Sequence, residues 1–347
     1  MPVYSHSRLS SYENCALQYR FRYVDRIKTR FESIEAFMGK RVHEVLEKAY
    51  TNLDEARRGG SSAWLRAFDD AWRSQLTPDV RVVRPDLDPD YYRSAGRRCL
   101  ETYWERNEPF RIEPEQIIGL ELKVELALDS TGRFRMMGYL DRAQHAGPGV
   151  IEIHDYKTTA TLPKEGSLRF DRQLPLYEIA LRQRFPETKD VRLVWHFLAH
   201  GVEVVETRTA QDLERVKRSA IGLIETIERA KEYPAKKSPL CAWCDFQDMC
   251  PEWKGVKPVA SPQFPNGRPT LAAGPAGSAV AAGPAVNEAR IPREPTASDA
   301  ATLPAATPPD VTPSEPTAIT SPAPKAPAGA AADPPRPPSR GGQLNLF

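Results

Sequence analysis

The stretch that decides the fold is residues 150–157, which read VIEIHDYK. Its alternating pattern predicts a β-strand, in which successive side chains point to opposite faces. Ile151 and Ile153 place one face in the core, and Asp155 and Lys157 follow on that same face at the end of the strand. A core disfavours unpaired charges. An active site uses them, because a carboxylate holds a divalent cation and a nearby lysine positions or deprotonates an attacking water.

A second carboxylate is expected beside Asp155. Residues 133–143 follow a turn and alternate as another strand, and Asp141 lies at the end of this adjacent strand. Carboxylates from adjoining strands offer the oxygen ligands that Mg²⁺ and Mn²⁺ prefer, and they form a minimum site for metal-assisted phosphodiester hydrolysis. The sequence therefore predicts a divalent-metal site with a lysine beside it.

The surrounding pattern predicts an α/β (α+β) domain. Apolar residues recur at helical spacing before residue 117 and alternate after it, which favours a helical N-terminal layer on a mixed sheet. The predicted helices span 5–30, 34–58, 62–76, 90–107, 170–184 and 210–232. The predicted strands span 117–128, 133–143, 150–157, 191–199 and 202–208.

Four motifs, in order along the chain, resemble those of the RecB-type branch of the PD-(D/E)XK nucleases. They are Gly39-x-x-x-His43-x-x-Leu46-Glu47, Gly138-x-x-Asp141-Arg142, Asp155-Tyr156-Lys157-Thr158 and Gln173-Leu174-x-x-Tyr177. The resemblance covers the chain from about residue 5 to residue 251. It implies a restriction-endonuclease-like mixed sheet flanked by helices, and DNA hydrolysis driven by two Mg²⁺ or Mn²⁺ ions.

The resemblance also implies roles for individual residues. His43, Asp141 and Asp155 would ligate metal, and the Tyr156 carbonyl would be an extra ligand. Lys157 would orient the attacking water and stabilise the developing charge. Each motif alone has a simpler explanation, since an Asp-x-Lys strand can be a solvated face and a lone histidine beside an apolar stripe is more often structural. Their joint order favours the nuclease site.

Gln173 and Tyr177 would support the centre or the DNA strand. Their i,i+4 spacing puts both side chains on one face of a helix. The simpler alternative is that they cap a core. Glu121, on the predicted strand 117–128, belongs to none of these motifs, and we interpret it as a solvated glutamate.

The cysteines suggest a second metal centre. Cys241-x-x-Cys244-x5-Cys250 is a compact triplet, and Cys15 offers a fourth thiolate early in the chain. This layout resembles the iron–sulfur nucleases of the same superfamily, namely AddB-type helicase–nuclease subunits and CRISPR-associated nucleases of spacer acquisition. Thiolates suit Zn²⁺ or a [4Fe–4S] cluster, and the single C-x-x-C pair favours the cluster. Cys99 is interpreted as a buried small apolar residue.

Composition divides the chain near residue 257. All six Trp and twelve Tyr precede that point, whereas 20 of the 33 Pro follow it. A segment so poor in aromatic residues buries too little apolar area to offset its ordering entropy, so 258–340 is predicted to be a disordered Pro/Ala-rich linker after a folded domain of 1–257. The formal net charge of +2 argues mildly against a protein that coats nucleic acid and leaves room for a local basic groove.

The C-terminal peptide 341–347 is out of character with the linker before it. It resembles the motif by which bacterial repair proteins dock on the sliding clamp of the replicative DNA polymerase III. In that motif a glutamine makes polar contacts and large apolar side chains fill a pocket. The matching residues here are Gln343, Leu344, Leu346 and Phe347. The simpler alternative is a sticky terminus without a partner.

These features favour a DNA exonuclease that acts on single strands or DNA ends in repair. The chain has no G-x-x-x-x-G-K-[ST] motif, so any helicase would be a separate partner. One alternative is a nuclease of CRISPR spacer acquisition, and another is a non-catalytic clamp adaptor that uses the fold to bind DNA. No signal peptide and no apolar run of roughly 20 residues is evident, which predicts a cytoplasmic protein at the nucleoid rather than a membrane protein.

Overall fold

The structure is a computed structural model that describes residues 2–107, 112–253 and 264–265. Most of the predicted linker 258–340 and all of the clamp-like peptide 341–347 lie outside the described residues. Among the described helices, none is both long enough and apolar enough to cross a membrane.

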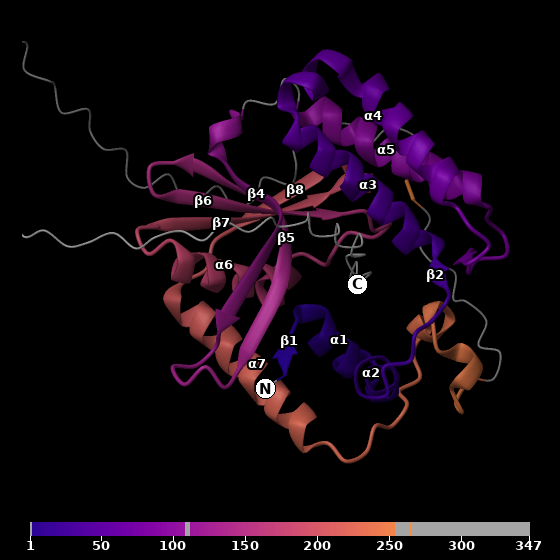
Figure 1. Ribbon diagram of the computed structural model, residues 1–347, viewed down its shortest axis with the longest axis vertical. Coiled ribbons are helices and arrows are strands. Elements are labelled where there is room, and N and C mark those ends of the chain that lie inside the picture. Colours follow the sequence, from indigo (N-terminus) through magenta and orange to yellow (C-terminus); the bar gives the residue numbers. More distant parts are fainter. Residues whose placement is uncertain (1, 108–111, 254–263, 266–347) are drawn as a thin grey trace, which may run out of the picture. The chain divides into compact units, whose positions relative to one another are not determined.

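Within the described residues, a mixed sheet of six strands forms the centre of the fold (Figure 1). Its strands are β1 (Val3–Tyr4), β4 (Ile117–Ala127), β5 (Arg135–Gly147), β6 (Val150–Lys157), β7 (Asp190–Phe197) and β8 (Val202–Glu206). Strand β5 pairs with β1, β4 and β6, and the sheet continues from β6 to β7 and β8. The pairs β1–β5 and β6–β7 are parallel and the others antiparallel. The fold class is therefore the predicted one.

Helices flank the sheet. The α-helices are α1 (His6–Asn14), α2 (Ala16–Tyr19), α3 (Ile34–Thr51), α4 (Leu53–Gln75), α5 (Pro89–Asn107), α6 (Gln173–Arg184) and α7 (Ala210–Arg229). A π-helical turn spans Arg20–Val24, and short 3-10 helices span Pro114–Gln116, Ser167–Phe170, Leu198–His200, Pro239–Trp243 and Gln247–Met249. A separate parallel pair joins β2 (Glu32–Ser33) to β3 (Val80–Arg81).

The two faces of the sheet bury two apolar cores. Ile151 and Ile153 pack into the core formed with α1, α6 and α7, which confirms the predicted orientation of their strand. Tyr156 points to the opposite face and packs into the core formed with α3, α4 and α5. Cys99 is fully buried in that second core, as predicted. Figure 1 shows α3, α4 and α5 together on one side of the sheet and α6 and α7 on the other.

The prediction of one continuous helix over residues 5–30 is wrong. Helix α1 ends at Asn14, because Cys15 takes up an extended backbone with φ −160° and ψ 111°. The chain then forms α2 and the π-helical turn, and Arg26 has a left-handed backbone with φ 56°. Cys15 consequently lies at a break between two helices rather than on one.

The predicted helix 34–58 is also interrupted. Asn52 leaves the helical conformation, with φ −129° and ψ 66°, so α3 ends at Thr51 and α4 begins at Leu53. Helix α4 then runs through the predicted helix 62–76, with a kink at Gly60, whose φ of 63° is one that glycine adopts without steric cost. The apolar periodicity correctly predicted helical structure in these residues, but it did not predict the break at Asn52.

Candidate metal and catalytic centre

His43 is presented by α3 and oriented by the backbone of β6. Its Nε2 lies 2.8 Å from the carbonyl oxygen of Tyr156. A carbonyl only accepts hydrogen bonds, so Nε2 must carry the ring proton and donate it. The lone pair of Nδ1 is then free to bind a cation, and a backbone carbonyl is a usual partner for the other ring nitrogen of a metal-bound histidine. The second lone pair of the Tyr156 oxygen remains available, so its predicted role as a ligand stays a prediction.

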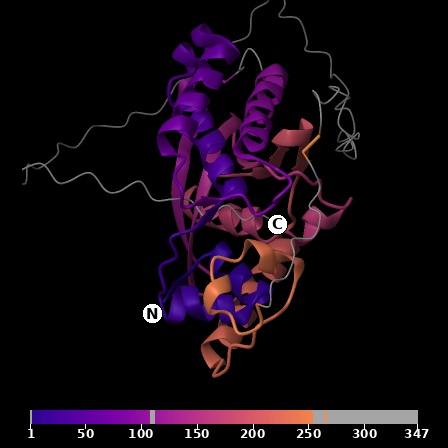
Figure 2. The same ribbon diagram turned by 90° about the vertical axis from the view of Figure 1, so that its right-hand side faces the viewer.

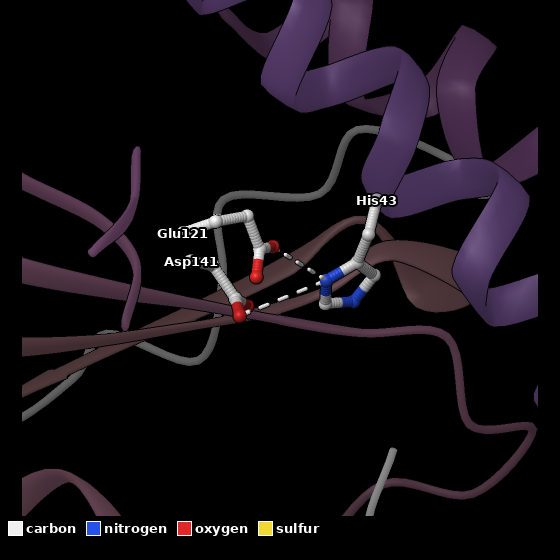
Figure 3. A group of neighbouring side chains, drawn as sticks. All are labelled: His43, Glu121 and Asp141. Atoms are coloured by element: carbon white, nitrogen blue, oxygen red, sulfur yellow. Dashed lines mark ion pairs between the residues drawn. The ribbon is translucent and has the colours of Figure 1, made fainter. Parts of the chain in front are cut away.

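The unprotonated side of His43 faces two carboxylates (Figure 3). Nδ1 lies 3.7 Å from Oδ1 of Asp141 and 4.0 Å from Oε1 of Glu121. Ligand atoms from these three residues all lie within 4.8 Å of one another, the one such group within the described part of the chain. A lone pair facing two carboxylates is unfavourable unless a proton or a cation lies between them. The arrangement therefore suits a hard divalent ion that takes oxygen and imidazole ligands.

Glu121 corrects the sequence analysis, which interpreted it as a solvated side chain. It sits opposite Asp141 in the β4–β5 hairpin, between the paired positions Leu120–Arg142 and Leu122–Leu140. Its φ is +42°, a left-handed conformation that is uncommon for residues other than glycine. Alternation along β4 cannot reveal this local distortion. The register of the hairpin is the signal that could have placed Glu121 beside Asp141.

Asp141 is fixed by β6. Its Oδ2 accepts a hydrogen bond of 2.7 Å from the backbone N–H of Tyr156. Burial raises the pKa of the Asp141 carboxyl above its usual value, the negative charge of Asp155 raises it further, and a proton on His43 would lower it. The net direction is upward, because the carboxylate is buried close to a second negative charge. A divalent cation would relieve that repulsion.

Lys157 is held as a cation at the other end of the group. Its Nζ lies 2.7 Å from Oδ2 of Asp155 and donates to Oε1 of Gln173 at 3.1 Å. Burial disfavours the charged form, but the charge and hydrogen bond of Asp155 outweigh it, so the pKa of Lys157 is raised. A lysine kept protonated cannot take a proton from water. It can orient a water molecule and stabilise negative charge that develops on a phosphate.

Gln173 and Tyr177 are one helical turn apart on α6, and Tyr177 is buried against the sheet. Gly138 explains how closely α6 approaches the sheet, because a Cβ at this position would lie 2.2 Å from Cε1 of Tyr177. The glycine of the Gly138-x-x-Asp141 motif therefore admits the tyrosine ring. This packing places Gln173 where it reaches Lys157.

The four cysteines singled out in the sequence line one cavity of about 440 Å³. Figure 2 shows the segment around residues 230–253, in orange, against the indigo N-terminal helices. The extended backbone at Cys15, which breaks the first helix, brings its thiol to this cavity. An ion pair of 2.6 Å between Arg22 and Asp245 joins the same two segments.

Backbone amides approach these sulfurs. The N–H of Lys236 points to Sγ of Cys15 at 3.5 Å, and the N–H of Ser238 points to Sγ of Cys241 at 3.4 Å. Burial raises the pKa of the Cys244 thiol to about 11, although the positive charge of Arg22 lowers it somewhat. Amide donors stabilise thiolates, so the cavity is suited to a cationic group that binds several sulfurs at once.

The comparison with protein families decides the identity of the domain. The model of the PD-(D/E)XK nuclease superfamily matches residues 3–251. The chain belongs to the PD-(D/E)XK nuclease superfamily. The domain is thus a nuclease domain, of a hydrolase superfamily that generally uses Mg²⁺ or Mn²⁺ and acts on DNA, and the acidic cluster of His43, Glu121 and Asp141 is a possible metal site in it.

Solved structures offer only distant likenesses to this nuclease domain. A chain from Eubacterium rectale described as a "Putative exonuclease" is 15% identical, with a TM-score of 0.41, over 70% of this chain and 86% of that one. A protein described as SSO0001 is 13% identical, with a TM-score of 0.28, over 71% of this chain and 94% of that one. Both TM-scores are too low to support an argument. A search of curated proteins found no significant match.

Replacing Glu121 with glutamine should stabilise the metal-free nuclease at pH 8 and weaken its binding of Mn²⁺. Burial, followed by the charge of Asp141, raises the pKa of Glu121 from 4.5 to about 7. An acid whose pKa is raised in the folded state stabilises the fold at pH values below its unfolded pKa. That stabilisation is lost as the pH rises through the folded pKa of about 7. Because the side chain is 36% exposed, we expect a discounted gain of about 1 kcal/mol at pH 8.

Urea denaturation in EDTA at pH 5 and pH 8 measures this gain. We expect the two proteins to differ little at pH 5, where Glu121 is protonated in the folded wild type. The exposed Glu115→Gln serves as the control and should change stability at neither pH. An equal gain at both pH values, or unchanged Mn²⁺ affinity, would show that Glu121 is not the acid described here.

Proposed function

We propose that the protein is a metal-dependent DNA exonuclease that acts on single strands or DNA ends in repair. One observation carries the proposal. His43, on α3, lies beside Asp141 of β5, although the two are far apart in the sequence. The neighbouring strand β6 adds Asp155 and Lys157, which pair with each other. A protein that only bound DNA would have no use for a buried acid beside a half-buried lysine, because such charges are costly to remove from water.

The residues of the cluster suggest a division of labour. His43, Glu121 and Asp141 would hold one Mg²⁺ or Mn²⁺ ion, and Asp141 together with Asp155 would hold a second. Bound divalent ions supply a more acidic water and neutralise charge on the phosphate. Lys157 would position that water and stabilise the charge that develops on the phosphate.

The nuclease itself is tested with DNA labelled at one end. We expect Mn²⁺-dependent release of nucleotides from single-stranded DNA, and a loss of roughly a hundredfold or more in Lys157→Ala, because the cation beside the reacting phosphate is removed. Lys123→Ala is the matched control, since Lys123 is an exposed lysine paired with Glu125. Equal activity in Lys157→Ala would refute the role of Lys157. Absence of any cleavage would favour the non-catalytic adaptor.

We also propose that the four cysteines bind a [4Fe–4S] cluster that joins the N-terminal helices to residues 241–250. Four thiols around one cavity support this. Sulfurs on one zinc ion would lie about 3.8 Å apart, given tetrahedral Zn–S bonds of roughly 2.3 Å. No three of these thiols lie within 4.8 Å of one another in the described chain. The wider spacing favours a cluster over a single ion.

Iron and sulfide analysis of protein purified without oxygen tests the cluster. We expect about four iron atoms per chain and visible absorbance, and both should be lost in Cys244→Ser. The melting temperature of Cys244→Ser should also be lower, because the cluster no longer joins the N-terminal helices to residues 241–250. Cys99→Ser is the control, since Cys99 is buried away from the cavity and should leave the iron content unchanged. Stoichiometric zinc in place of iron would overturn the assignment.

The clamp-like peptide supports recruitment to DNA behind a replication clamp. Gln343, Leu344, Leu346 and Phe347 offer the polar and apolar groups of a short linear anchor, and a helicase is a further candidate partner. Deleting 343–347 should abolish binding of the chain to immobilised sliding clamp while nuclease activity on free DNA persists. If the sliding clamp binds neither the full chain nor the chain without residues 343–347, recruitment by the clamp is refuted. That result would favour the CRISPR-type alternative, which shares the catalytic residues.

A further inference from the structure

The segment between β6 and α6 borders the nuclease centre. It leaves the sheet at Lys157 and ends at Gln173, whose side chain returns to Lys157. The segment is anchored at Leu168, whose carbonyl accepts a hydrogen bond of 2.8 Å from Arg208 and another of 2.9 Å from the backbone N–H of Asp171. Its 3-10 turn, Ser167–Phe170, therefore stands at a fixed position beside the centre.

Phe170 projects from this anchored turn. Its side chain is 75% exposed, the highest value among the exposed large hydrophobic residues of the described chain. The guanidinium carbon of Arg169 lies 4.5 Å from the centre of the Phe170 ring. Solitary exposed apolar residues are common and need no function. An exposed ring held within three residues of a side chain that touches the catalytic lysine is a more specific observation.

Two buried side-chain nitrogens, one of them in this segment, have no hydrogen-bond partner among the described residues. They are Nδ1 of His6, on the first turn of α1, and Nε of Arg172. Arg172 pairs with Glu13 of α1, the helix that begins at His6, and the residue after Arg172, Gln173, accepts a hydrogen bond from Lys157. Burial, and then the charges of Arg172 and Lys157, lower the pKa of His6. Buried polar atoms without partners are rare in proteins and call for a ligand.

The remaining contacts define what that ligand must be. Nε2 of His6 lies 3.2 Å from the Ser10 hydroxyl, and with Ser10 as donor Nδ1 carries a proton. The terminal nitrogens of Arg172 donate to Glu13 at 3.2 and 2.6 Å, which leaves its Nε–H directed elsewhere. Two N–H donors beside the Lys157 ammonium would be satisfied by an anionic acceptor. A phosphate has the required charge and several acceptor oxygens.

We propose that His6, Arg172 and Phe170 form a binding subsite for one nucleotide next to the scissile phosphate. His6 and Arg172 bind the phosphate of that nucleotide, and Phe170 stacks on its unpaired base. This inference rests on the proposed nuclease function and specifies its substrate. Phe170 is three residues from Gln173, at most about 10 Å along the chain, so the base lies within a few nucleotides of the cleaved bond.

The subsite makes the nuclease selective for unpaired strands. A base can stack on Phe170 only when it has left the double helix, and such stacking does not depend on its identity because every base has a π-face. The enzyme should therefore bind single-stranded DNA or a frayed end more tightly than a blunt duplex, without strong sequence preference.

Binding of labelled single-stranded DNA, measured by fluorescence anisotropy in a Lys157→Ala background, tests the base contact without cleavage. Phe170→Ala should weaken binding about tenfold, whereas Phe170→Trp should retain it, because stacking needs an aromatic ring. The matched control is Leu162→Ala, since Leu162 is another exposed apolar residue of the same segment, 40% exposed. Equal losses in Phe170→Ala and Leu162→Ala would overturn the stacking role.

An abasic nucleotide, moved stepwise from the end of the strand, locates the contact. At one position the missing base should weaken binding to the protein that retains Phe170. The same missing base should not weaken binding to Phe170→Ala, because the aromatic partner of the base is already absent. Additive losses at every position would show that Phe170 touches no base.

The phosphate contacts have a separate signature. Arg172→Ala and His6→Ala should weaken binding uniformly across sequences, and Arg172→Ala should reduce the salt slope by about one ion. Glu13→Gln removes the partner of Arg172 and should bind DNA at least as tightly. Unchanged affinity in both alanine variants would refute the phosphate role. Failure of the nuclease proposal is read separately, from wild-type protein that releases no nucleotides from single-stranded DNA in Mn²⁺.

Discussion

The structure depends on the backbone of one residue, Tyr156. Its N–H donates to Asp141 at 2.7 Å, and its carbonyl accepts from His43 at 2.8 Å. These two bonds connect β5, β6 and α3 at a single point. Because Asp155 and Lys157 flank Tyr156 on the same strand, fixing the backbone of Tyr156 also fixes the positions of these two residues. The centre thus assembles around backbone geometry and not around contacts between long, mobile side chains.

Contacts of the Tyr156 side chain on the opposite face of the sheet hold this residue in place. The Tyr156 hydroxyl lies 3.3 Å from that of Tyr103, which lies 2.6 Å from that of Tyr50. The guanidinium of Arg142, the residue after Asp141, lies 4.1 Å from the ring centre of Tyr50. A buried polar network of this kind is rigid when its members are paired. The packing of α3 and α5 is therefore coupled to the position of Asp155 and Lys157, although neither helix supplies them.

Local pattern was enough to predict much of this arrangement. Alternation in β6 fixed which face carries Asp155 and Lys157, since the period of a strand is two and both isoleucines are buried. The same rule failed for Glu121, because a left-handed residue interrupts the strand and alternation presumes regular backbone. The breaks at Cys15 and Asn52 were missed for a similar reason. Neither residue is a glycine or proline, so neither carries the strongest local signal for the end of a helix.

We propose above all that His43, Glu121 and Asp141 share a divalent ion. Anomalous diffraction from crystals soaked in Mn²⁺ tests it most directly, because the scattering of manganese identifies the ion without reference to activity. We predict a peak bonded to Nδ1 of His43 and to an oxygen from each of the two carboxylates, at about 2.0–2.3 Å. A protein that cleaves DNA with Mn²⁺ but shows its manganese peak away from His43 and Glu121 would contradict the claim.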